Sequence, residues 1–334
     1  MNLTQRRKGA KERVRIVMKK LVLFTVLGSM LLTGCQRNNS SSTDQPTIAL
    51  VLKTLNNPFF IDMQKGAEDA SKKLGVKLLV QAAEREVDVE KQMQIIENLI
   101  QTKVAALCIT PSGSKEIVPA IVKANKVGIP VLIVDTRVNQ PALDAAGGRI
   151  SGFIGSDNLE GGRVAGQFIV KALQGKGKVA VLEGIPGHET GDSRLKGFRE
   201  IMANNPGIEI VSSQTANWER DQGYTVFQNV LQAHPEIQAL FACSDLMALG
   251  AVEAISAAGK TGKIIVVGFD AFSEARDAVM KGTMAATIAQ SSYDMGRTAV
   301  ENALHVLRGE KIQEDISLGV QLITKENAKP VSAQ

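Results

Sequence analysis

Polar and aromatic side chains follow several apolar runs of this sequence directly or within a few residues, at positions where binding chemistry could be placed. They are Asn57 with Phe59 and Phe60, Asp135 with Thr136 and Arg137, Trp218, Ser244 with Asp245, Asp270 and Gln290. Carboxylates accept hydrogen bonds from hydroxyl groups, an arginine donates in a planar fork, and such charge-assisted bonds are about twice as strong as neutral ones. Aromatic rings pack against apolar C–H faces. Together these residue types suit a sugar, which has both hydroxyl groups and apolar faces.

Each of these residues also has a purely structural explanation. Asp135 and Asp270 could cap helices that follow a strand, and Trp218 could fill the interior of a lobe. Phe59 and Phe60 could both pack in a core, but adjacent helical positions point about 100° apart, so one of them is expected to face elsewhere. The pattern of suitable groups after separate apolar runs nevertheless favours a binding site.

Signatures of catalysis and of metal binding are missing from the sequence. The three histidines, His188, His234 and His305, are far apart and form no HExxH or Cys-His metal motif. No G-x-S-x-G nucleophile motif is present, and Ala254 stands where a Walker A loop ending in residues 259–261 would need its first glycine. We therefore predict a protein that is not an enzyme and that has no cofactor and no metal site.

The apolar runs predict strands that alternate with helices from Thr47 onwards. Most runs are rich in Val, Ile and Leu without period-2 alternation, which is typical of strands buried on both faces. Amphipathic segments lie between them, and one is bounded by the helix-start signal Asn57-Pro58 and the helix-end signal Gly75. We predict strands over 47–53, 76–81, 104–109, 130–134, 151–155, 178–182, 208–213, 238–242, 263–267 and 284–289.

Ten strands exceed one ordinary open sheet, so we predict two α/β lobes with parallel sheets built from strand–helix–strand units. Glycines at 147, 148 and 155 interrupt the pattern and place a boundary near 150–157. In open α/β sheets, ligands bind outside the carboxyl ends of the strands. Two lobes that face each other through these ends would bring the polar and aromatic residues around one cleft.

The N-terminal 34 residues have the parts of an export signal. A basic stretch precedes an apolar run over 21–32, which is too short to span a bilayer as a helix. The run leads into Leu-Thr-Gly-Cys35, which resembles the lipobox of bacterial lipoproteins and implies lipid attachment at Cys35; the alternative is an ordinary signal peptide with a chance cysteine. Residues 35–46 are polar and predict a flexible tether. We expect an exported, lipid-anchored protein in the periplasm or at the outer face of the cytoplasmic membrane.

The formal charge of +5 is concentrated in the same leader. Residues 1–34 carry eight Lys or Arg and one Glu, whereas the rest of the chain has 31 basic and 33 acidic residues. The balance therefore gives no support for nucleic-acid binding. A hydrophobic content of 44% excludes an intrinsically disordered chain. Met18 would make a more ordinary start than Met1, so residues 1–17 could be a misassigned extension.

Several motifs resemble those of the ribose-binding proteins of bacterial ABC importers, which are type I periplasmic binding proteins. The matching segments are TLNNPFF at 54–60, VVGFD at 266–270 and AATIAQ at 285–290, with shorter matches at 156–158 and 248–251. The likeness runs from about Thr47 to Thr324. It implies two Rossmann-like lobes that are joined by three crossovers and close over a monosaccharide. The N-terminal lobe would be 47–156 plus about 291–320, and the C-terminal lobe 157–290 plus about 321–334.

The resemblance also implies which residues contact the ligand. The positions that carry over are Asn57, Phe59, Phe60, Asp135, Arg194, Trp218, Asp270 and Gln290. Trp218 stands where the ribose binders have Phe, and Ser244 where they have Asn. The ribose binders have Asp followed directly by Arg, but here Thr136 intervenes before Arg137. We include Arg137 and Ser244 in the predicted site.

The implied function is that of an extracytoplasmic solute-binding lipoprotein, acting as a monomer, which delivers its ligand to an ABC permease in the membrane. A site built for one hydroxyl pattern rejects another, so the departures at Thr136 and Ser244 leave ribose, other pentoses, hexoses and polyols open. A sensor that presents its ligand to a chemoreceptor or histidine kinase would share this fold and site. A secreted enzyme would turn over the bound sugar, and a LacI-type repressor would need a helix-turn-helix headpiece in place of the export signal.

Overall fold

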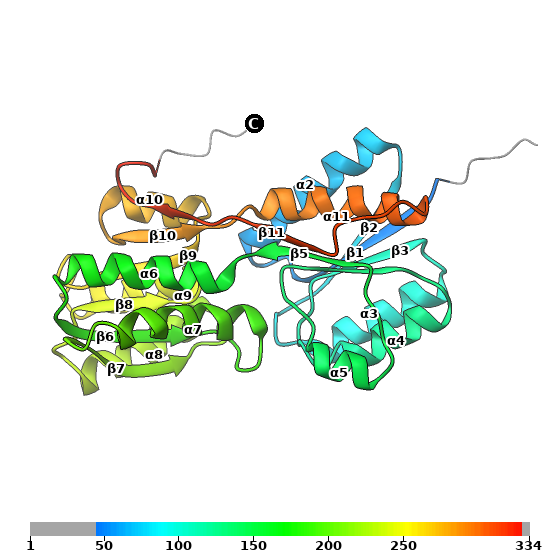
Figure 1. Ribbon diagram of the computed structural model, residues 1–334. Coiled ribbons are helices and arrows are strands. Elements are labelled where there is room, and N and C mark those ends of the chain that lie inside the picture. Colours follow the sequence, from blue (N-terminus) through cyan, green and yellow to red (C-terminus); the bar gives the residue numbers. More distant parts are fainter. Residues whose placement is uncertain (1–44, 329–334) are drawn as a thin grey trace, which may run out of the picture. The chain divides into compact units, whose positions relative to one another are not determined.

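The computed structural model describes residues 45–328, in which two six-stranded sheets are flanked by helices (Figure 1). The N-terminal sheet comprises β1 Thr47–Thr54, β2 Lys77–Ala83, β3 Ala106–Ile109, β4 Val131–Val134, β5 Gly152–Ser156 and β11 Asp315–Leu318, in the order β11-β5-β4-β3-β1-β2. The C-terminal sheet comprises β6 Gly177–Glu183, β7 Ile208–Thr215, β8 Ala239–Ala242, β9 Ile265–Asp270, β10 Ala286–Ala289 and β12 Gln321–Ile323, in the order β12-β10-β9-β8-β6-β7.

Each sheet has its own set of helices. Around the N-terminal sheet lie α2 Pro58–Leu74, α3 Val89–Gln101, α4 Val118–Lys126, α5 Gln140–Ala145 and α11 Ser292–Leu307. Around the C-terminal sheet lie α6 Asn158–Ala172, α7 Glu189–Ala203, α8 Arg220–Ala233, α9 Asp245–Ala257 and α10 Ser273–Lys281. Within these residues no helix is long and apolar enough to cross a lipid bilayer.

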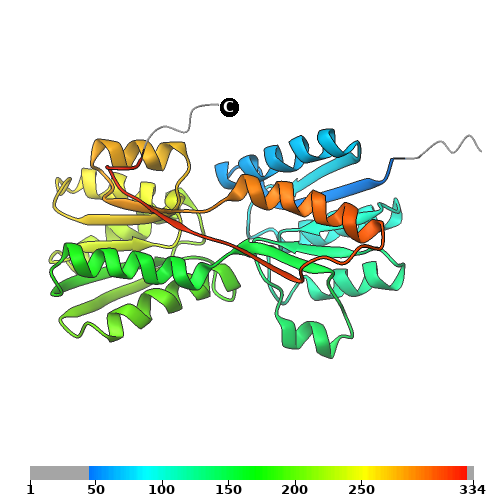
Figure 2. The same ribbon diagram turned by 45° about the horizontal axis from the view of Figure 1, so that its top comes forward.

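The chain passes between the two sheets three times. The crossings lie between β5 and α6, between β10 and α11, and between β11 and β12. Figure 2 shows the last of them, in red, running from one sheet to the other. The sheet pairings are parallel except for β10 with β12. The predicted class, two α/β lobes with parallel sheets and three crossovers, is confirmed.

Strand β1 illustrates why the apolar runs form central strands. Ile48, Leu50 and Leu52 face the helices α2 and α11, whereas Ala49 and Val51 face the cluster that includes α3 and α4. Both faces are buried, so the run needs apolar residues at every position. The ten predicted strands all form, with ends that differ by up to three residues.

Two short strands were not predicted. β11 and β12 have four and three residues; β11 alternates exposed and half-buried residues, and β12 begins with an exposed residue. They lie at the edges of their sheets, so they lack the continuous apolar run that marks a central strand.

Some predictions concern residues that the structure does not describe. The signal peptide 1–34, the lipid attachment at Cys35, the tether up to residue 44 and residues 329–334 of the C-terminal lobe all lie outside residues 45–328.

Candidate functional site

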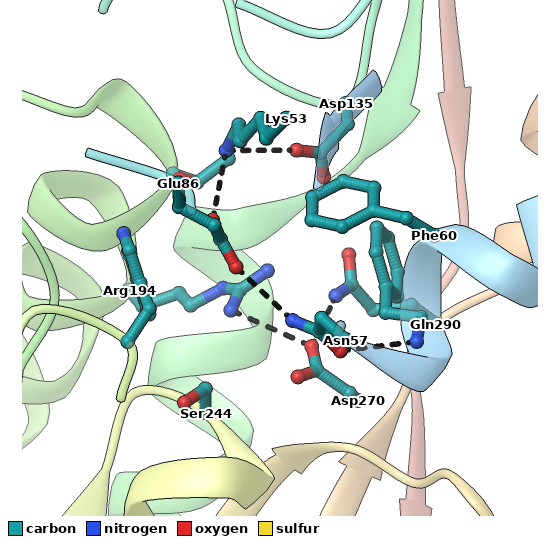
Figure 3. A pocket seen from close by; sticks show the side chains of 12 residues that line it. Lys53, Asn57, Phe60, Glu86, Asp135, Arg194, Ser244, Asp270 and Gln290 are labelled. Carbon is teal, nitrogen blue, oxygen red and sulfur yellow. Dashed lines mark hydrogen bonds and ion pairs between the residues drawn. The ribbon is translucent and has the colours of Figure 1, made fainter. Parts of the chain in front are cut away.

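A pocket lies at the carboxyl ends of strands from both sheets (Figure 3). Its lining residues are Lys53, Asn57, Phe59, Phe60, Glu86, Asp135, Thr190, Arg194, Trp218, Ser244, Asp270 and Gln290. The structure therefore brings together nine of the ten predicted site residues, and Arg137 is the exception. Lys53, Glu86 and Thr190 also line the pocket and were not predicted.

The start of α2 supplies the aromatic wall of the N-terminal lobe. Asn57 is the N-cap of this helix and its side chain accepts a hydrogen bond from the Phe59 amide at 3.0 Å. Phe59 and Phe60 are both buried, with ring centroids 5.2 Å apart in an edge-to-face arrangement. The prediction that one of them faces elsewhere is wrong: both line the pocket, because the first turn of α2 lies at the pocket wall.

A charged network lies beside this wall. The Nζ atom of Lys53 is 3.3 Å from Oδ2 of Asp135 and 3.7 Å from Oε2 of Glu86. Asn57 donates to Oε1 of Glu86 at 3.1 Å, as Figure 3 shows. Burial raises the pKa of Glu86, and the charge of Lys53 opposes this rise. The sequence signal that could have identified Lys53 is its charge near the end of an otherwise apolar strand.

Arg194 on α7 is the buried cation of the C-terminal lobe, with 4% of its surface exposed. Its Nε donates to Oδ1 of Asn158 at 2.9 Å and its Nη1 donates to the carbonyl of Cys243 at 2.7 Å. Nη1 also lies 3.7 Å from Oδ1 of Asp270. The guanidinium carbon is 3.7 Å from the centroid of the Phe269 ring. These contacts hold the planar group in one orientation beside the pocket.

Asp270 ends β9 and faces Arg194 across the C-terminal side of the pocket. Burial raises its pKa to about 7, and the charge of Arg194 opposes this rise. Gln290 donates to Oδ1 of Asp270 at 2.7 Å, while its own Oε1 is buried without a hydrogen-bond partner among residues 45–328. Asp245 lies behind the pocket lining, where it accepts from Thr287 at 2.7 Å, and burial and the charge of Asp270 raise its pKa.

Three lining residues adopt left-handed backbone conformations. The φ angles of Asp135, Trp218 and Asp270 are 65°, 68° and 120°. Such conformations cost non-glycine residues roughly 1–3 kcal/mol each and cluster at functional sites. The alternative that the two aspartates are helix caps does not hold, because the residues preceding α5 and α10 are Asn139 and Phe272.

Arg137 does not line the pocket. Its guanidinium donates to both carboxylate oxygens of Asp315 at 2.8 and 2.9 Å and stacks on the ring of Phe153. The side chain is 38% exposed. Thr136 is buried instead and donates to Oδ2 of Asp135 at 2.8 Å. The inserted threonine thus leaves the arginine side chain away from the pocket, and the predicted role of Arg137 is corrected.

The charges that line the pocket nearly cancel. Lys53 and Arg194 are cations, Glu86 and Asp135 are acidic, and Asp270 titrates near neutral pH. An added ionic ligand would bring an uncompensated charge into this buried region, which is costly. The pocket therefore favours an uncharged molecule that carries both hydroxyl groups and apolar faces.

The comparisons with known proteins cover most of the chain. A family model described as periplasmic binding protein domain matches residues 48–311. The ribose import binding protein of Bacillus subtilis is 39% identical over 92% of this chain and all of its own length. The D-allose-binding periplasmic protein of Escherichia coli is 36% identical over 86% of this chain and 91% of its own.

Solved structures of ABC transporter proteins are also similar. A periplasmic solute-binding protein from Actinobacillus succinogenes, with bound D-allose, has a TM-score of 0.81 and 40% identity, over 85% of this chain and 99% of that one. A solute-binding protein from Agrobacterium vitis, bound with alpha-D-tagatopyranose, has a TM-score of 0.81 and 30% identity, over 85% of this chain and 96% of that one.

Proposed function

We propose that this chain, which belongs to the family of periplasmic binding protein domains, is the solute-binding protein of a bacterial ABC importer and captures a monosaccharide in the pocket between its lobes. The observation that carries this proposal is the pocket itself, which combines balanced buried charges with an aromatic residue from each lobe. The relatives described above are named as binding proteins, which is consistent with a protein that is not an enzyme.

The ligand would lie with its apolar faces against Phe60 and Trp218. Its hydroxyl groups would donate to Asp135 and Asp270 and would accept from Arg194. Such charge-assisted bonds are the stronger ones in a buried site. Because Phe60 and Trp218 come from different lobes, the ligand contacts favour the closed arrangement of the lobes.

Ribose, D-allose and D-tagatose are the first ligands to test, because they appear in the names and titles of similar proteins. Lys53 and Glu86 add a hydrogen-bonding edge on the N-terminal side of the pocket. These additional polar groups favour a ligand with more hydroxyl groups than ribose has. We therefore rank D-allose ahead of ribose as the candidate ligand. Thr136 and Ser244 would take part in the choice between sugars.

The leader sequence supports an extracytoplasmic location. The apolar run before Cys35 and the polar residues after it suit a lipid-anchored protein tethered to a membrane. In this proposal the closed monomer docks on the permease subunits and releases its sugar there.

A thermal-shift measurement on residues 36–334 tests the proposed function. The protein is unfolded and refolded to remove endogenous ligand, then heated with pentoses, hexoses, polyols and, as controls, amino acids. At a hundred times the dissociation constant, a ligand that binds only the native state stabilises it by roughly 2.7 kcal/mol, so one or a few monosaccharides should raise the melting temperature clearly. A response to an amino acid and to no sugar would contradict the assigned ligand class.

The affinity should depend on pH through Asp270. Its pKa is raised to about 7, and sugar hydroxyls that donate to it favour its ionised form. Binding below neutral pH must therefore release a proton, and the affinity should rise roughly tenfold from about pH 6 to about pH 8. Titration calorimetry in buffers of different ionisation enthalpy measures both effects. An affinity that stays constant over this range, with no proton release, would contradict the proposed role; Asp270→Asn should remove the dependence.

A further inference from the structure

The indole of Trp218 packs against Gly184 and Gly191, which have no side chain that would occupy its place. A Cβ atom added to Gly184 would lie 1.9 Å from Cζ2 of the indole, and one added to Gly191 would lie 3.0 Å from it. The backbone beneath the ring is strained, with φ angles of 51° at Asn217 and 68° at Trp218. The side chain is 5% exposed and lines the pocket. The ring is therefore placed by its surroundings and is not simply filling space.

His188 is the polar side chain that contacts the Trp218 indole. The indole Nε1 donates to Nδ1 of His188 at 3.4 Å, and the histidine is 4% exposed. Burial and the charge of Lys53 lower the pKa of His188 to about 3, so the ring is neutral at neutral pH. An indole N–H can only donate, so Nδ1 is the acceptor and the ring proton lies on Nε2.

The same histidine reaches the other lobe. The backbone of Ser112, in the loop after β3, acts on the His188 ring and partly opposes the fall in its pKa. The neighbouring amide of Glu189 donates to Oγ of Ser114 at 3.3 Å. The loop is itself held, because the Ser112 amide donates to Gln92 at 2.8 Å. The start of α7 therefore contacts a fixed loop of the N-terminal lobe, close to the Trp218 indole.

We propose that His188 is a positioning residue, which orients the Trp218 indole against the ligand and ties that orientation to contact between the two lobes. The proposal rests on the proposed function, since it takes Trp218 to be a wall of a sugar site. His188 thus lies between the indole of its own lobe, which donates to it, and the loop of the other lobe, whose Ser114 accepts from the adjacent Glu189 amide. A ligand that holds the ring in place therefore also favours the contact between the lobes.

Trp218 is the only tryptophan of the chain, so its spectra report on this contact directly. The full chain is compared with three variants: His188→Leu, which removes the acceptor; His188→Asn, whose amide oxygen can stand near the position of Nδ1; and His305→Asn, a control at an exposed histidine. Tryptophan fluorescence and ultraviolet resonance Raman spectra of the ligand-free proteins report hydrogen bonding of the indole. Titration with D-allose and ribose gives the affinities.

We expect His188→Leu to change the indole hydrogen-bond signal before any ligand is added, and to weaken sugar binding about tenfold. His188→Asn should recover the indole signal and part of the affinity, and His305→Asn should behave as the wild type. In small-angle scattering, the compaction caused by the sugar should be smaller for both His188 variants, because neither has the imidazole on which the backbone of Ser112 acts.

A double-mutant cycle with Trp218→Phe separates positioning from a general structural role. Phenylalanine has no N–H group, so the loss of His188 should cost much less affinity in that background. Equal losses in both backgrounds, or an unchanged indole signal in His188→Leu, would overturn the inference. If His188→Leu does not fold, His188→Asn in the same cycle provides the test. A wild type that binds no monosaccharide would instead refute the proposed function, while the ligand-free spectra would still test the indole contact.

Discussion

Replacing Asp270 with alanine is expected to weaken monosaccharide binding at least about a hundredfold, since a hydrogen bond to a charged group contributes roughly 1.5–3 kcal/mol and unpaired buried partners add to the loss. The carboxylate faces the pocket, and its loss would remove an acceptor for ligand hydroxyls and a partner of Arg194 and Gln290. The fold should remain, because relief of the repulsion between Asp270 and the buried Asp245 offsets part of the cost of leaving Arg194 without this partner.

Titration calorimetry with the sugar that stabilises the wild type measures this effect. Asp277→Ala is the matched control, because Asp277 is an exposed aspartate on the adjacent helix α10. Asp270→Asn keeps the shape of the side chain and removes its charge, so it should also bind weakly. Wild-type affinity in Asp270→Ala would refute the assignment of the site.

Replacing Arg194 with methionine is expected to lower both stability and affinity. The buried guanidinium contacts Asn158, the carbonyl of Cys243 and Asp270. Removing one partner of a buried ion pair costs up to about 3–5 kcal/mol where the remaining group stays charged, and less where that group takes up a proton. Without the arginine, the pKa of Asp270 should rise further, so this carboxyl would be protonated at neutral pH and would accept sugar hydroxyls poorly.

Urea denaturation at neutral pH and calorimetric titration measure the two losses. Arg199→Met on the same helix is the control, because that side chain is 52% exposed and should change the stability by less than about 0.5 kcal/mol. Adding Asp270→Asn to Arg194→Met should change the stability little at neutral pH, where the carboxyl is already protonated, and should restore part of it at higher pH, where the carboxyl would otherwise ionise without a partner. Additive losses in the double variant would mean that the two groups do not interact.

The sequence by itself was sufficient for the fold class and for most of the residues that line the pocket. Runs such as β1 are apolar at nearly every position, and only a strand buried on both faces requires this. Parallel strands point their carboxyl ends to the same edge of a sheet, so residues that follow different strands must meet there. Asp135, Trp218, Ser244 and Asp270 were found in this way, without knowledge of any contact between them.

Arg194 was predicted only from the resemblance to ribose-binding proteins, and not from the position of residues after strands. Arg194 lies within α7 and follows no strand, so its sequence neighbourhood resembles that of any helical arginine. Its contacts with Asn158 and Cys243 join residues 36 and 49 positions away in the sequence. Such partners are identified only when the helix is packed against its sheet.

Only the tertiary structure decided which way the remaining side chains point and which charges pair. Arg137 lies two residues from Asp135, yet it binds Asp315 on an edge strand that the sequence did not predict. Lys53 and Glu86 meet across 33 positions of sequence and stay buried because each compensates the other's charge. Local patterns determine which elements form and where they end, because they reflect burial of the nearest residues. Side-chain direction and ion pairing depend on groups far along the chain, which packing alone brings within a few ångströms.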